Sequence, residues 1–390
     1  MKLSVVAGML VSLSTLCACG ASNEKEGSGG SGGSGGDWGS GGSGGSGGGT
    51  PMPKPLECTQ QTSIPGIDRG SENGLDRFLA ITEDQGDLVG VITSKTFVDF
   101  VRWPAAGGDP IRTTIATGLD YPSAPSIAAF GGTIHVTWTE FATGFHHAVS
   151  SPGGFVSEVF APDATTGGLV RGAAIPEILW IDTMGLIHTS KYSGGMWMDT
   201  ATDGYGSQGG TLEAIKDAAG HFHVAQASSG SVGYMNNVNG TWSYDSVHTP
   251  PPNVYRSEAS LALKSSGDAY VAWAEGPYVQ WEQYKDGAYV AQASLTKVGL
   301  DDALGVGLTM RGDTPWFVTA TWPASGPGVI YTPITVGSIG TDNAKIVDYN
   351  AYTSSPALLW IGATLHVVWA RYGGFSGSST IAHSTCQQQP

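Results

Sequence analysis

One position of a repeated sequence phrase carries residues that could bind a polar ligand. The phrase is clearest at 131–140, GGTIHVTWTE, where alternating bulky residues end on Glu140. Along the chain the same position is filled by Ser94, Glu140, Asp182, Ser228, Glu275, Trp322 and Arg371. Carboxylates and Arg form strong hydrogen bonds with hydroxyls or acids, and an aromatic ring stacks on the apolar face of a sugar. This position therefore predicts a binding surface for a polar ligand with apolar faces, such as a sugar chain.

Tyrosines and arginines precede the strand before this phrase and extend the same surface. Three tyrosines, Tyr121, Tyr255 and Tyr352, each lie five residues before the same position of the first strand of a repeat. Two arginines, Arg171 and Arg256, lie in the equivalent segments. The start of one strand lies beside the end of its antiparallel neighbour, so both sets are expected on one face. The candidate ligand-binding residues are Tyr121, Glu140, Arg171, Asp182, Tyr255, Arg256, Glu275, Trp322, Tyr352 and Arg371. Strand ends on a solvated face are ordinarily charged, and this simpler interpretation stays open.

The elements that must position these residues are strands that recur about every 46 residues, a spacing typical of a β-propeller. The first bulky position of the phrase is filled by Val89, His135, Glu177, His223, Tyr270, Phe317 and His366. No stretch shows sustained helical periodicity. The sequence predicts an all-β fold, a seven-bladed β-propeller of four-stranded antiparallel blades. In the third repeat the strands are expected at 171–175, 176–182, 186–192 and 196–202.

Histidines and tryptophans fall on shared positions of the repeats, which favours packing over chemistry. The shared positions group His135 with His223 and His366, His147 with His188 and His383, and Trp138 with Trp180, Trp273 and Trp369. Aromatic residues fill the same histidine positions in other repeats, as expected for packing between sheets. His221 and His223 point to one strand face, but no third ligand is evident. We therefore expect no metal site and no cofactor.

The N-terminus reads as a secretory signal followed by a tether. Lys2 precedes an apolar run at 3–16, and Leu16-Cys17-Ala18-Cys19 resembles the bacterial lipobox. That resemblance implies cleavage before Cys19, a lipid on its sulfur, and anchoring in the outer membrane or at the cell surface after passage through the inner membrane. A plain secretory signal is the alternative. The expected division is 1–18 signal peptide, 19–56 lipidated Gly/Ser-rich tether and 57–387 propeller.

With Cys17 removed and Cys19 lipidated, two cysteines remain at the two ends of the propeller region. They are Cys58 and Cys386, in a compartment that permits disulfides. The last repeat offers only three strands, so the N-terminal segment around Cys58 is expected to complete it beside the strand that ends at Cys386. This predicts ring closure by strand exchange and a Cys58–Cys386 disulfide. Two free thiols are the alternative.

The repeat, a small-residue strand followed by G-x-x-H-V-x-W and later G-G-x-W, resembles blades of sialidase-like secreted bacterial propellers across 77–385. The sialidase Asp-box, S-x-D-x-G-x-T-W, is absent, and its nearest fragment is Asn239-Gly240-Thr241-Trp242. No equivalent of the sialidase arginine triad and tyrosine nucleophile is found. The resemblance therefore implies the fold and not the activity.

Composition narrows the class of partner. The net charge is −15, with 18 Lys and Arg against 33 Asp and Glu, which argues against nucleic acid. The expected function is that of a monomeric lipoprotein, held to the membrane through Cys19, whose propeller binds an extracytoplasmic polysaccharide. A propeller-type polysaccharide lyase or glycoside hydrolase is the first alternative. A protein–protein interaction scaffold is the second.

Overall fold

The computed structural model describes residues 56–67, 77–140, 143–228, 231–248, 256–275, 278–295, 302–322, 329–335, 338–339, 345–348, 352–372 and 379–388. The chain divides into two units, Met1–Pro51 and Met52–Pro390, and every described residue belongs to the second. Every regular element assigned in the described residues is a β-strand, so the predicted all-β class is confirmed. Within this described part of the chain, no helix has the length and apolar character needed to cross a membrane.

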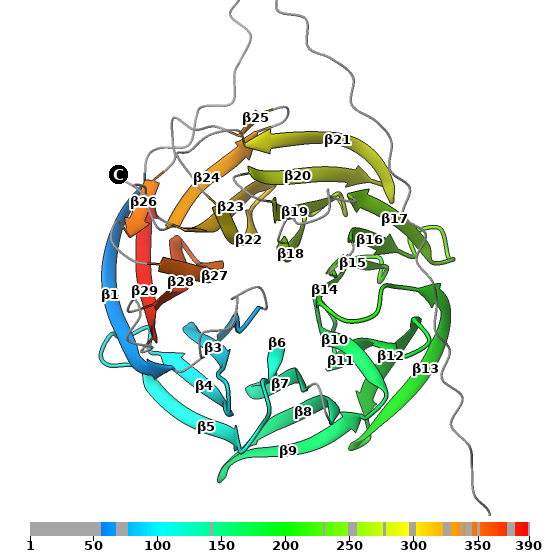
Figure 1. The fold of residues 1–390 in the computed structure, drawn as a ribbon, viewed down its shortest axis with the longest axis horizontal. Helices are drawn as coiled ribbons and strands as arrows, with labels where there is room; N and C mark the ends of the chain where they lie inside the picture. The colour runs from blue at the N-terminus through cyan, green and yellow to red at the C-terminus, as the bar shows by residue number, and fades with distance from the viewer. Residues whose placement is uncertain are drawn as a thin grey trace, which may run out of the picture. The chain divides into compact units, whose positions relative to one another are not determined.

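The strands form small antiparallel sheets around a common centre, as in a propeller (Figure 1). One sheet holds β2 (Leu79–Asp84), β3 (Asp87–Thr93), β4 (Phe97–Trp103) and β5 (Ile111–Thr117). The next holds β6 (Ser123–Phe130), β7 (Thr133–Glu140), β8 (Gly144–Ser151) and β9 (Gly154–Ala161). Another holds β18 (Arg256–Leu263), β19 (Ala269–Glu275), β20 (Tyr278–Lys285) and β21 (Ala288–Leu295).

Two further groups of strands are merged into one eight-stranded sheet. The first group is β10 (Ala164–Arg171), β11 (Glu177–Asp182), β12 (Leu186–Ser193) and β13 (Met196–Tyr205). The second is β14 (Thr211–Lys216), β15 (Phe222–Ala227), β16 (Val232–Asn236) and β17 (Ser243–His248). A short parallel pairing of Val170 with Ala214 and Arg171 with Ile215 joins β10 to β14.

The remaining strands close the ring. β22 (Asp302–Arg311), β23 (Thr314–Trp322), β24 (Val329–Thr335), β25 (Ser338–Ile339) and β26 (Lys345–Asp348) form one sheet. β27 (Tyr352–Ile361), β28 (Thr364–Tyr372) and β29 (Ser379–Gln388) form another, to which β1 (Leu56–Ile67) is added. Around the centre, β2, β6, β10, β14, β18, β22 and β27 each contact the next, and β27 contacts β2. The arrangement of sheets is therefore propeller-like, as predicted.

The N-terminal strand completes the last sheet in the expected way. β1 pairs with β29 in antiparallel register, with Cys58 opposite Cys386, and the two cysteines form a disulfide. The pairing joins residues separated by 328 positions in sequence. The predicted disulfide and the predicted strand exchange are both confirmed, and together they leave β29 without an open edge.

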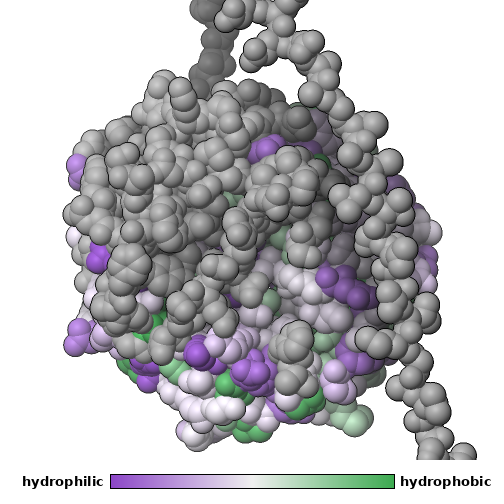
Figure 2. All heavy atoms as spheres, in the orientation of Figure 1, coloured by the Kyte–Doolittle hydropathy of each residue, from purple (hydrophilic) through white to green (hydrophobic). Residues whose placement is uncertain are grey.

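The core lies between neighbouring sheets and uses the predicted positions. Trp138, Trp273 and Trp369 are 2% exposed or less. His135 and His147 stack with their ring nitrogens 3.0 Å apart, and His366 and His383 repeat this pair at 3.1 Å. These four histidines are packing residues, as expected. The outer strands, by contrast, expose apolar side chains that are interspersed with polar ones on the face drawn in Figure 2.

The third repeat differs from its predicted register. Its first strand is β10, Ala164–Arg171, where the sequence predicted 171–175. The glycines of this strand hide its pattern, and packing requires at least one of them: a Cβ on Gly167 would lie 2.9 Å from the Phe145 ring and from Trp180 Cβ. Arg171 consequently ends this strand and does not precede it.

Candidate functional site

In these repeats the end of the second strand lies beside the start of the first strand, as predicted. In the backbone register Asp182 is opposite Ala164, Glu275 opposite Arg256, and Arg371 opposite Thr353. Trp322 is likewise opposite Asp302, and Tyr352 begins β27. For Arg256, Glu275, Trp322 and Tyr352 only the backbone is described, and Tyr255 and Cys19 lie outside the described residues.

A cleft of about 710 Å³ opens beside these strand ends. It lies between the sheets of β6–β9 and β10–β13 and the start of β14. Tyr121 and Glu140, both predicted, line it from the first sheet. Asp163, Thr165 and Thr183 line it from the second. Gln208 and Thr211 complete the wall. Two of the predicted residues are thus brought together in one cavity.

Glu140 lies in the cleft wall, where its carboxylate connects two loop segments. Its Oε1 accepts the Asp120 N–H at 2.7 Å, and its Oε2 accepts the Thr143 hydroxyl at 2.6 Å. His146 Nε2 is 3.2 Å from the same Oε2, and the His146 ring stacks on Trp138. Burial lowers the pKa of His146, although Glu140 opposes the shift. The carboxylate is therefore hydrogen-bonded and oriented, and only 6% of the residue is exposed.

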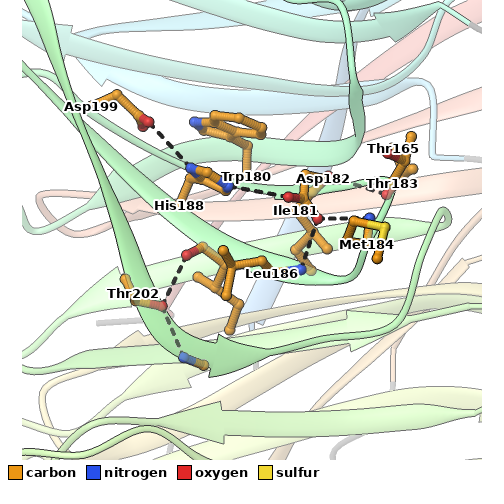
Figure 3. Close-up of polar contacts among 12 residues, drawn as sticks. Thr165, Trp180, Ile181, Asp182, Thr183, Met184, Leu186, His188, Asp199 and Thr202 are labelled. Atoms are coloured by element: carbon orange, nitrogen blue, oxygen red, sulfur yellow. Dashed lines mark hydrogen bonds and ion pairs between the residues drawn. The ribbon is translucent and has the colours of Figure 1, made fainter.

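Asp182 anchors a turn at the equivalent position of the next sheet (Figure 3). Its Oδ1 accepts the N–H groups of Met184 and Leu186, each at 2.8 Å, and its Oδ2 is 3.4 Å from His188 Nε2. Burial acts to raise the pKa of Asp182, but these two backbone N–H groups and His188 outweigh it and lower the pKa. Asp182 does not itself line the cleft, although the next residue, Thr183, does.

His188 lies between two carboxylates, above the Trp180 ring (Figure 3). The ring centroids of Trp180 and His188 are 3.9 Å apart, and His188 Nδ1 is 3.2 Å from Asp199 Oδ2. His188 Nε2 is 3.4 Å from Asp182 Oδ2, so each ring nitrogen of His188 faces one carboxylate. Ser190 links the set, since it accepts the Trp180 indole N–H and donates to Asp199.

The alignment of His188 in the sequence analysis was wrong. His188 is opposite Trp180, as His146 is opposite Trp138, whereas His147 is opposite Thr137. Two neighbouring sheets therefore repeat one arrangement, in which a second-strand Trp stacks on a third-strand His that contacts a carboxylate two residues after the Trp. The signal was present as the pairs Trp138 with Glu140 and Trp180 with Asp182, but the one-residue offset between His146 and His147 concealed it.

Arg171 does not belong to this face, contrary to the prediction. It reaches a small central cavity of about 60 Å³, where its guanidinium donates to Glu213 at 3.1 Å and to the Leu261 carbonyl at 2.6 Å. Arg77 also pairs with Glu213 and lies 3.9 Å from Glu258. Burial acts to raise the pKa of Glu213, but Arg77 and Arg171 outweigh it and lower the pKa. This charged cluster was missed because its members come from different repeats.

The two remaining predicted residues have simpler surroundings. Tyr121 donates its N–H to the Lys95 carbonyl at 3.0 Å, and Lys95 Nζ lies 5.0 Å from the Tyr121 ring centroid. Tyr121 has a φ of 50°, an uncommon backbone conformation for a residue with a side chain. The Arg371 guanidinium lies 5.8 Å from the Trp369 ring centroid. Among the described residues, no group of three His, Cys, Asp or Glu side chains could hold a metal ion.

Gln226 is a functional candidate that the sequence analysis did not single out. It takes the place that Trp138 has in β7, and it is 1% exposed. Its Oε1 accepts the Ser207 N–H at 2.9 Å, and its Nε2 donates to the carbonyls of Ser207 and Gly209. Gln226 therefore positions the segment that carries Gln208 in the cleft wall. A polar residue at an otherwise aromatic repeat position was the available signal.

No known protein family matches the sequence, and no curated protein matches it. Solved structures match at the level of the fold. The WD40 repeats of RRP9 are 11% identical with a TM-score of 0.53, over 84% of this chain and 99% of that one. The polysaccharide lyase Uly1 is 11% identical with a TM-score of 0.52, over 86% of this chain and 100% of that one. The NanB sialidase from Streptococcus pneumoniae is 9% identical with a TM-score of 0.48, over 83% of this chain and 70% of that one. The RRP9 and Uly1 structures therefore show that this chain has a β-propeller fold.

Proposed function

We propose that this protein is a lipid-anchored, seven-bladed propeller whose cleft binds an extracytoplasmic polysaccharide. The anchor is the lipid on Cys19, which places the protein at the outer membrane or cell surface. The cleft between β6–β9 and β10–β13 is the single observation that carries the binding function. The blade count follows if β10–β13 and β14–β17 are two blades, because only two residue pairs join them.

The composition of the cleft supports a carbohydrate ligand. Its volume of about 710 Å³ lies in the range of small-ligand sites, which suits a few sugar units of a longer chain. Tyr121 offers a ring for an apolar sugar face, and Glu140, Thr165 and Gln208 offer hydrogen-bonding groups for hydroxyls. The fold likeness to Uly1, a polysaccharide lyase, is consistent with this ligand class.

The test is retention of the full-length protein, in detergent, on immobilised bacterial and algal polysaccharides. Tyr121→Ala removes the ring of the cleft and should weaken retention by about tenfold, given what one aromatic stack contributes. Tyr244→Ala is the matched control, because Tyr244 is 44% exposed on the outer strand β17. If both variants and the unchanged protein are retained equally, the cleft is not the site of binding.

Catalysis at the same cleft is the second candidate. The observation that favours it is the contact of Glu140, which lines the cleft, with His146, since acid–base chemistry uses such carboxylate–histidine pairs. Shortened or unsaturated products in the retention samples would make the protein a hydrolase or lyase, and Glu140→Gln should then abolish them. If the samples show no retention and no products, the protein–protein interaction scaffold is favoured.

A further inference from the structure

The charge of the cleft wall restricts the kind of glycan that fits. Asp120, Glu140 and Asp163 contribute carboxylates to the wall, and none of the described lining residues is Lys or Arg. Asp120 and Asp163 are exposed, whereas both oxygens of Glu140 already accept hydrogen bonds. An acidic sugar entering this cleft would therefore meet two exposed carboxylates at short range.

Among the described residues at the wall, cations are fewer than these carboxylates. Lys95 lies over the Tyr121 ring and is not part of the lining. Arg77 accepts the Ala124 N–H through its carbonyl, but its guanidinium pairs with Glu213 in the central cavity. The sign of the local charge is thus set by acids.

Two hydroxyls in the wall have an unmet hydrogen bond. Thr139 Oγ1 and Thr211 Oγ1 are buried without a hydrogen-bond partner, and both residues line the cleft. Thr211 is only 5% exposed. A buried polar atom without a partner is costly, so a side-chain rotation that turns either hydroxyl toward a ligand group would lower that cost. The wall therefore favours a ligand that carries hydrogen-bonding groups as well as positive charge.

We infer that the cleft selects a glycan that is rich in hydrogen-bond donors and has no acidic groups. This inference rests on the proposed polysaccharide-binding function. Hydroxyl, amide and ammonium groups donate to the carboxylates of Asp120 and Asp163, whereas uronates, sialates and sulfates are repelled by them. Neutral and amino-bearing sugars share the required chemistry, and the amino-bearing chain gains additional attraction.

The experiment compares three hexasaccharides of matched length on the full-length protein by titration calorimetry. They are a chitosan hexamer, a chitin hexamer and an oligogalacturonate hexamer. We expect the chitosan hexamer to bind most tightly, the chitin hexamer next, and the oligogalacturonate at least about tenfold more weakly than the chitin hexamer. Raising the salt concentration should weaken only the chitosan complex.

The Asp120→Asn/Asp163→Asn double variant identifies the carboxylates responsible. It should lower chitosan affinity by about tenfold, lower chitin affinity by less, because the Asn side-chain oxygens still accept hydrogen bonds, and narrow the difference from oligogalacturonate. Asp203→Asn is the control, because Asp203 is exposed on β13 and is not part of the wall. Tightest binding of oligogalacturonate by the unchanged protein, or affinities that do not change in the double variant, would overturn the inference and leave the polysaccharide-binding function standing. Binding of none of the three, with no retention on the wider polysaccharide panel, would end both.

Discussion

Each histidine pair comes from two strands of one sheet, packs against the neighbouring sheet and is held as neutral rings. His135 and His366 have pKa values lowered to about 4, and His383 to about 3, with burial as the main cause. Sequence reasoning recognised these positions as packing sites because aromatic residues fill them in other repeats. It did not foresee that two histidines would stack on each other, since that contact depends on the diagonal between the second and third strands.

These pairs make the stability of the protein sensitive to acid. In the unfolded chain each ring is protonated below about pH 6.5, whereas the native rings stay neutral to about pH 4. The unfolded state therefore binds more protons in that window, and stability is lost as pH falls through it. His366→Phe, which introduces the residue that Phe317 supplies in the neighbouring sheet, should lose roughly 2 kcal/mol less stability between pH 7 and pH 4.5. Urea unfolding at the two pH values measures this, and equal losses in both proteins would contradict it.

At the scale of the element, bulges at the starts of the inner strands decide which side chains reach the centre. The register shifts near the start of β6, β10, β18, β22 and β27. Glu258 and Ser355 lie within two of these shifts, and their side chains meet at 2.6 Å. In the third repeat the last three strands lie where the sequence predicted them, but a bulge leaves no periodic signal. Arg171 was assigned to the wrong face because the glycines of β10 hide its pattern, and the central cluster was not predicted because its members come from different repeats.

The central cluster ties several sheets together, so we expect Glu213 to be important for stability. It accepts the Leu261 N–H at 2.7 Å and the Ser260 hydroxyl at 3.1 Å in addition to its two arginines. Glu213→Gln should lower the free energy of unfolding by about 3 kcal/mol, because it removes the closest carboxylate of buried Arg77 and leaves only Glu258, at 3.9 Å. Denaturant unfolding measures this. Glu158→Gln, at a side chain that is 58% exposed, is the control and should change stability by well under 1 kcal/mol.

At the scale of the whole molecule, the closure of the ring was the most predictable feature. The sequence offered a repeat with one strand too few and a cysteine at each end, and only one arrangement satisfies both. The cleft was less predictable, because its wall combines a strand end, a turn and the loop that Gln226 holds, and loop positions do not follow the repeat. Tyr121 and Glu140 were found from their register, whereas Asp163, Gln208 and Thr211 were not.

Removing the Cys58–Cys386 disulfide tests how much of the stability depends on closure. The bond spans 328 residues, for which the loss of chain entropy on closing the loop gives at most about 5 kcal/mol. The pairing of β1 with β29 remains in a Cys58→Ser/Cys386→Ser variant, so it should fold and melt at a lower temperature. Thermal unfolding followed by circular dichroism gives the difference. The unchanged protein treated with reductant should match the variant, and a variant as stable as the oxidised protein would show that strand pairing alone closes the ring.

The proposed lipid anchor is tested independently of the ligand. If Cys19 carries the lipid, Cys19→Ser should take up no labelled palmitate and should appear in the soluble fraction, because several acyl chains on one residue are what hold such a protein at a membrane. Cys17→Ser, which changes a residue of the segment that we expect to be cleaved away, is the matched control and should stay labelled and membrane-bound. Label retained by the Cys19 variant would place the lipid elsewhere, whereas no label on either variant or on the unchanged protein would favour a plain secretory signal and a freely diffusing propeller.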